Sequence, residues 1–248
     1  MLPGFDMIRG RKFMRGRAEM IEAVRSERVG AVMVLMIILA TAGCGGSGAR
    51  RTAEALENDP QNHYRWAREQ HMRGYYKEAL ESIDKAIALD GTGYQYFNER
   101  GLIHLHAGQA EAALLDFQAV LGINPLYTDA HNNLGATLAE LGRNREARAE
   151  YEKVLADPLY PRQELAHANI ADLAFADGDY AGAIQALRRA VAANNDYARA
   201  HFKLGQCYRA LGRLDAAQES FETVLKLTPL SAQGREAKQI LEDMGRVD

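Results

Sequence analysis

A glycine that is followed five residues later by an alanine recurs along most of this chain of 248 residues. The pairs are Gly74/Ala79, Gly108/Ala113, Gly142/Ala147, Gly178/Ala183 and Gly212/Ala217, at intervals of 34, 34, 36 and 34 residues. A fixed period of this length is typical of stacked helical hairpins, in which each repeat buries its apolar face against its neighbours. The chain is therefore expected to be all-α.

Two further positions keep the same register. A small residue lies twelve residues before each alanine (Ala67, Gly101, Gly135, Ala171, Gly205), and a large apolar residue lies four residues after it (Ile83, Phe117, Tyr151, Leu187, Phe221). Apolar positions with this spacing form one buried stripe on the second helix of a hairpin. The small residue lets the first helix approach closely, and we expect Gly135 and Ala147 to face each other.

The period and these marker residues resemble the tetratricopeptide repeat (TPR) family. The resemblance implies a right-handed TPR superhelix, an α-solenoid of five helix-turn-helix repeats followed by a capping helix. We place the repeats at 60–93, 94–127, 128–163, 164–197 and 198–229, and the capping helix at 230–248. Pro125 and Pro229 support two of these ends because proline cannot continue a helix.

The N-terminal segment has the order of a secretory signal, with basic residues, an apolar run over 29–43 and then small residues. Fifteen uncharged residues are short for a membrane span, which needs about 20. Thr41, Ala42, Gly43 and Cys44 resemble a bacterial lipobox, whose cysteine is lipidated after residues 1–43 are removed. An uncleaved anchor helix is the alternative. The resemblance implies a lipid anchor in the outer membrane, facing the periplasm, with 44–59 as tether and half-repeat.

The charge balance argues against nucleic acid. Residues 1–43 hold seven basic and four acidic residues, which leaves 23 basic and 29 acidic residues, a net charge of −6, for the rest of the chain. Nucleic-acid binding favours dense basic patches. We expect a protein partner, and no nucleic acid or small-molecule substrate.

No nucleophile and base can be paired from spacing, so we expect no enzyme activity and no cofactor. Four histidines occupy equivalent positions (His63, His131, His167, His201), but equivalent positions in a solenoid are too far apart to share a metal. They are expected to pack between repeats. Cys207 is expected to be buried as a small apolar group.

The first helices of TPR hairpins line a concave face. By register, the residues expected in this groove are Tyr64, Asn98, Leu102, Asn132, Asn133, Asn169, Phe175, Arg199, Phe202 and Lys203. Amides can pair with a peptide backbone while the apolar side chains bury anchors, so the groove suits a peptide. Asn169, Arg199 and Lys203 also resemble part of the carboxylate clamp of some TPR domains, although Asn132 and Ala136 replace the usual Lys and Asn.

Residues 132–183 resemble the type IV pilus biogenesis lipoproteins of the PilF/PilW/Tgl pilotin family. The distinctive match is the junction from Asp157 to Pro161, DPLYP, followed by Ala166 and Asn169. The resemblance implies a pilotin that binds the secretin subunit of the pilus and promotes its outer-membrane assembly. The alternative is another envelope lipoprotein adaptor that organises cell-wall enzymes or export complexes.

Overall fold

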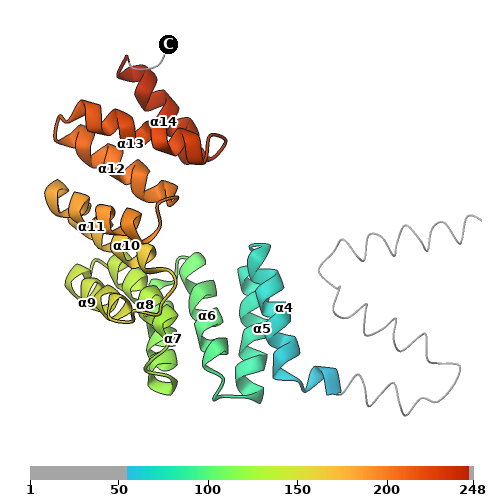
Figure 1. The fold of residues 1–248 in the computed structure, drawn as a ribbon. Helices are drawn as coiled ribbons and strands as arrows, with labels where there is room; N and C mark the ends of the chain where they lie inside the picture. The colour runs from blue at the N-terminus through green and yellow to red at the C-terminus, as the bar shows by residue number, and fades with distance from the viewer. Residues whose placement is uncertain (1–54, 246–248) are drawn as a thin grey trace, which may run out of the picture. The chain divides into compact units, whose positions relative to one another are not determined.

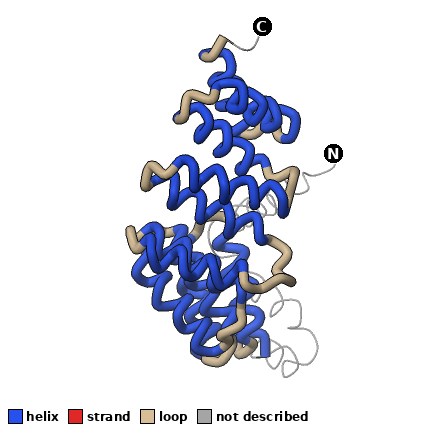
Figure 2. The backbone as a smooth tube through the Cα atoms, turned by 60° about the vertical axis from the view of Figure 1, so that its left-hand side comes forward, coloured by secondary structure: helices blue, strands red, loops and turns tan. Residues whose placement is uncertain are grey.

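The computed structural model describes residues 55–245 and is all-α over that range, as predicted (Figures 1 and 2). Five hairpins follow one another and end in a single helix. The first helices of the hairpins are α4 (Pro60–Met72), α6 (Tyr94–His106), α8 (Thr128–Glu140), α10 (Gln163–Ala176) and α12 (Ala198–Ala210). The second helices are α5 (Tyr76–Leu89), α7 (Ala110–Ile123), α9 (Asn144–Leu155), α11 (Tyr180–Ala193) and α13 (Leu214–Leu227), and the last helix is α14 (Ala232–Asp243).

The recurring glycine makes the turn inside each hairpin. All five of these glycines have a positive φ, between 70° and 79°, and each lies two residues after the last residue of the first helix of its hairpin. This left-handed conformation is costly for a residue with a Cβ atom and accessible to glycine. The regular turn thus explains why the period is visible in the sequence.

The buried alanine and the large apolar residue of each repeat form the core, and all five alanines are 0% exposed. The small residue of the first helix lies against the large residue of the second. A Cβ atom built on Gly135 would have three atoms of the Tyr151 ring as its nearest neighbours, at 2.6 to 3.0 Å. The sequence did not predict this contact, and the expected approach of Gly135 to Ala147 stays a prediction.

The described residues fall into two units, 55–63 and 64–245. Within the described part of the larger unit, helices that follow one another in sequence pack together from α5 to α14. Successive first helices also touch, α6 with α8, α8 with α10 and α10 with α12, whereas successive second helices in that part do not. The first helices therefore line the inner side of this unit.

Three of the four equivalent histidines bond to the segment just before their own helix. The Nε2 atoms of His63, His131 and His201 donate to the carbonyl oxygens six residues earlier, those of Glu57, Pro125 and Asn195, at 2.8, 3.2 and 2.8 Å. Because a carbonyl only accepts, the Nε2 atom of each of these three histidines carries the hydrogen of this bond. These histidines hold the start of a hairpin to the preceding turn, which is a structural task.

α14 covers the last hairpin. Ser231 accepts a bond from the backbone nitrogen of Gly234 at 2.9 Å and so caps the helix, and Ala237, Ile240 and Leu241 join the core of the two preceding hairpins. No helix within the described range is long and apolar enough to span a membrane. The signal segment and Cys44 lie outside the described residues.

Candidate functional site

Four asparagines on the inner side pair with one another across neighbouring hairpins. Asn133 Nδ2 on α8 donates to Asn98 Oδ1 on α6 at 3.2 Å, and Asn169 Nδ2 on α10 donates to Asn132 Oδ1 on α8 at 3.3 Å. We call these residues the amide row. All four are partly exposed, so each amide retains hydrogen-bonding capacity toward the solvent side. The sequence predicted the residues but not their pairing.

The amide row leads into a cluster of three charged side chains, which we call the ion cluster. Asp172 on α10 binds Arg199 through Oδ2, and its Oδ1 lies 3.1 Å from Lys203 Nζ on α12. Arg199 also donates to Asn169 Oδ1 at 3.4 Å. Burial lowers the pKa of Arg199 while the Asp172 carboxylate raises it, and the net shift is upward. Arg199 is therefore a permanent cation in this cluster.

The apolar residues expected in the groove divide into two groups. Tyr64 packs edge-on against Tyr96 with ring centroids 5.4 Å apart, and Phe175 packs in the same way against Tyr180 at 5.2 Å. Tyr64, Leu102 and Phe175 are partly exposed and can contact a ligand. Phe202 is only 4% exposed and packs against Phe221 in the core. We therefore remove Phe202 from the candidate site.

Lys203 connects the ion cluster to the apolar surface. Its Nζ atom lies 5.4 Å from the centroid of the Phe175 ring, within the range of a cation–π contact. The resemblance to a carboxylate clamp is thus incomplete in two ways, because Asn132 and Ala136 replace its other polar residues and because Asp172 already binds both cations. The inner side carries its own carboxylate at this point.

A chain of polar contacts that sequence analysis missed links α4 and α6. Glu99 Oε1 accepts from His71 Nδ1 at 2.7 Å, and His71 Nε2 lies 2.7 Å from His106 Nδ1. Arg68 Nε is 3.9 Å from the other oxygen of Glu99. His71 and His106 are 35 residues apart, one more than the repeat period at this point, so they do not occupy equivalent positions and the register did not indicate the contact. Among the described residues, no three metal-binding side chains come together as a metal site.

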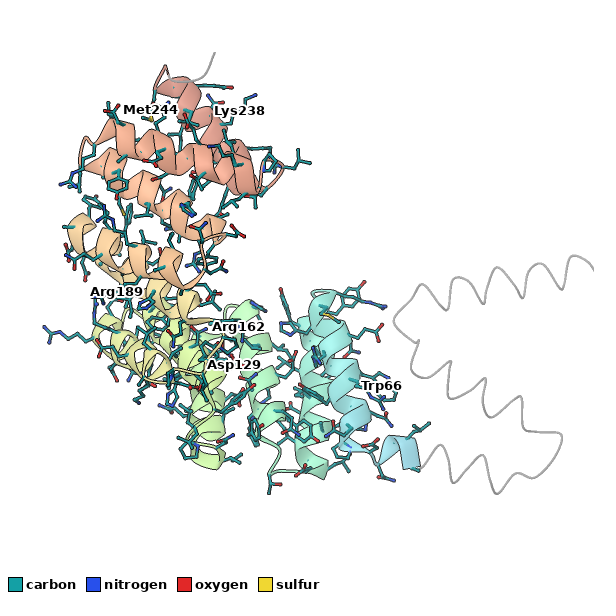
Figure 3. All side chains as sticks on the ribbon, in the orientation of Figure 1. Trp66, Asp129, Arg162, Arg189, Lys238 and Met244 are labelled. Carbon is teal, nitrogen blue, oxygen red and sulfur yellow. The ribbon has the colours of Figure 1, made fainter. Side chains whose placement is uncertain are left out.

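The irregular junction between the third and fourth hairpins is tied to α8 at both ends. The Tyr160 hydroxyl donates to Asp129 Oδ1 at 2.7 Å, and Thr128 Oγ1 donates to Asp157 Oδ2 at 2.8 Å. Arg162 also binds Asp129, at 2.5 Å. Figure 3 labels both residues. Burial and the Asp129 carboxylate raise the pKa of Tyr160. Between these anchors the side chain of Leu159 is 89% exposed.

Comparison with known protein families gives a match over most of the chain. Profiles described as tetratricopeptide repeat match residues 64–127, 107–164 and 132–198, and a second profile with the same description matches residues 174–241. The matched range runs from the first half of α4 to α14 and contains every member of the amide row and of the ion cluster.

Similar proteins include co-chaperones and pilus proteins. The chain is 33% identical over 122 residues, 49% of its own length and 22% of the relative's, to the tetratricopeptide repeat and J domain-containing co-chaperone DNJ1 of Cryptococcus neoformans. It thus spans under a third of the length of that relative. The crystal structure of PilW, a widely conserved type IV pilus biogenesis factor, aligns over 76% of this chain and 94% of that one, with a TM-score of 0.62 and 24% identity.

A second solved structure, described as a functional characterization of pilF from Pseudomonas aeruginosa, aligns over 77% of this chain and 88% of that one. Its TM-score is 0.66 and its identity 15%. Likeness at these identities shows that the chains share a fold.

Proposed function

Because the chain belongs to the tetratricopeptide repeat family, whose fold is a protein-interaction scaffold, we propose that it binds a peptide segment of a protein partner along the inner side of its first helices. The amide row carries this proposal. Its four asparagines come from the first helices of three successive hairpins, α6, α8 and α10, and their remaining donors and acceptors can pair with an extended backbone. Tyr64, Leu102 and Phe175 supply apolar contacts beside them.

We further propose that the partner is the secretin subunit of a type IV pilus and that the chain acts as a pilotin. The fold it shares with PilW over most of both chains supports this, together with the DPLYP junction of the sequence. Deleting the gene should abolish secretin multimers on a denaturing gel and stop twitching motility. Normal multimers and normal motility in the deletion strain would contradict the proposal.

The inner side can be tested separately from the partner's identity. Replacing Asn132 and Asn133 together by alanine removes one bond to Asn169 and one to Asn98, both on a partly exposed surface. The fold should therefore persist, while partner affinity should fall by about 1 kcal/mol or more through lost amide bonds. Circular dichroism and partner pull-down measure the two effects. Undiminished capture would move the binding surface away from the amide row, with Leu159 as the next position to replace.

We propose that Cys44 carries a lipid that holds the protein in the outer membrane, on the periplasmic side. The lipobox-like residues before it support this. Cys44→Ser should abolish labelling by a fatty-acid analogue, because a hydroxyl group does not replace a thiolate as the nucleophile that forms the thioether. Unchanged labelling of the variant would rule out Cys44 as the acylated residue.

The alternative is a different envelope adaptor that organises cell-wall enzymes or export complexes. The same repeats and the same amide row would serve it. Gene neighbourhood discriminates between the two: pilus genes nearby favour the pilotin, and hydrolase or polysaccharide-export genes favour the adaptor.

A further inference from the structure

Asp172 is an unusual residue for its position in the repeat. The equivalent residues of the other four hairpins, each eleven residues before the marker alanine as Asp172 is, are Arg68, Leu102, Ala136 and Gln206. None of these is acidic, so hairpin packing does not require an acid at this position. Asp172 is only partly buried, with 30% of its side chain exposed, and it faces two cations whose side chains are 36% and 28% exposed. The three charges are therefore within reach of a ligand on the inner side.

The carboxylate of Asp172 takes the places that an incoming anion would need. Both of its oxygens are bound, one to Arg199 and one to Lys203. The remaining terminal contacts of Arg199 go to Asn169 Oδ1 and to the Tyr197 hydroxyl, each at 3.4 Å. A second carboxylate would have to displace Asp172 or lie beside it. The cluster has a net charge of +1 instead of the +2 of its two cations alone, and Asp172 repels a carboxylate beside it, so Asp172 weakens the attraction for a second anion.

We propose that Asp172 is a specificity-determining residue, which lowers the affinity of the inner side for peptide segments that carry a carboxylate at the ion cluster, relative to uncharged segments. Specificity often depends on a repulsive element of this kind rather than on a new attraction. With Asp172 in place, the amide row and Phe175 favour a neutral segment. Without its negative charge, Arg199 and Lys203 would form an open anion site. The inference rests on the proposed peptide-binding function and deepens it.

Two fluorescently labelled pentapeptides test the proposal. Both begin with glycine, serine and leucine. The acidic peptide ends in two aspartates with a free carboxyl terminus, and the neutral peptide ends in two asparagines with an amidated terminus. Fluorescence anisotropy gives the affinity of each peptide for the wild type and for Asp172→Asn. The expected result is that the ratio of acidic to neutral affinity rises about tenfold or more in the variant, and that high salt removes the gain.

Two further variants make the result specific. Asp172→Ala should raise the ratio of acidic to neutral affinity as much as Asp172→Asn does. Melting curves show whether either variant has a folding defect, and the other variant then decides the outcome. Adding Arg199→Gln to Asp172→Asn should remove the gain, because half of the open site is lost. An unchanged ratio in both Asp172 variants, or a gain that persists without Arg199, would overturn the proposal.

The double variant Asn132→Ala/Asn133→Ala separates this inference from the proposed function. If the inner side binds peptides, this change weakens both peptides alike. Weakening by the asparagine changes together with an unchanged ratio in the Asp172 variants would leave the peptide-binding function standing and refute the role of Asp172. No binding of either peptide to any variant would refute both.

Discussion

Gly135 lies directly against the ring of Tyr151, so that a methyl group on the glycine would come within 2.6 Å of the ring carbon Cε1. The same relationship joins Gly101 to Phe117 and Gly205 to Phe221, at 2.8 and 2.6 Å. In the two hairpins that have alanine at the small position, the larger partner is aliphatic, Ile83 with Ala67 and Leu187 with Ala171. Glycine thus accompanies an aromatic ring, and alanine accompanies a branched aliphatic side chain.

The first prediction follows from this size match. Gly135→Ala should destabilise the protein by about 1–3 kcal/mol, because the buried ring must move to admit the methyl group. Adding Tyr151→Leu should recover part of the loss, since the pair then resembles Ala171 and Leu187. Chemical denaturation of the single and double variants gives the coupling energy.

As a matched control, Gly122→Ala on the exposed face of α7 meets no atom within 4 Å and should be neutral or slightly stabilising. Strictly additive effects of the two core changes would contradict the size match.

The second prediction concerns the marker alanine. Ala147→Glu should cost several kcal/mol and unfold the third hairpin or the whole protein, because Ala147 is 0% exposed and the added charge has no buried partner. Ala149→Glu, two residues further along α9 on the exposed face, should leave the melting curve nearly unchanged. Circular dichroism melting distinguishes the two variants, and equal curves would show that the repeat register is wrong.

The third prediction is a pH dependence. Burial, with Arg189 nearby, lowers the pKa of His167 in the folded state. Below about pH 6.5 the His167 side chain therefore binds a proton more readily in the unfolded chain than in the folded one. The free energy of unfolding falls as the pH drops through this range. His167→Gln should match the wild type in pH dependence above about pH 7 and lose less stability than the wild type in acid. Denaturant titrations across this range measure the difference, and parallel pH profiles would exclude His167 as a contributor.

The fourth prediction concerns the buried thiol. Cys207 is 0% exposed, and burial raises the pKa of its thiol to about 11. Since the thiolate is the reactive form, alkylation at about pH 8 should be slow in the folded protein and fast in denaturant. Mass spectrometry of a Cys44→Ser variant follows Cys207 alone. Rapid labelling under native conditions would show that the fifth hairpin opens readily.

The hairpins were predictable because their markers act locally. A turn glycine needs a positive φ wherever it occurs, and Ala113 or Ala217 lies in its own hairpin regardless of what the neighbours do. Position in the repeat also identified the asparagines of the inner side. Counting residues could not show that Phe202 rotates into the core, because the register only places a side chain on one side of a helix.

Contacts between hairpins were less accessible. The pairing of Asn133 with Asn98 depends on the offset between neighbouring hairpins, and the repeat length does not determine this offset. The contact of Asp172 with Arg199 and Lys203 depends on the same offset and on the rotamers of two long side chains. A resemblance to a carboxylate clamp identified the two cations but not the acid that binds them.

The match between glycine and ring has a consequence for how such a chain can change. Both partners belong to one hairpin, Gly205 in α12 and Phe221 in α13. A duplication or exchange of a whole hairpin therefore keeps the glycine together with its aromatic partner. Recombination at a turn glycine would instead join the first helix of one repeat to the second helix of another. An aromatic ring could then meet an alanine, or a smaller side chain could leave a cavity beside a glycine. The hairpin, rather than the helix, is thus the heritable module of this protein.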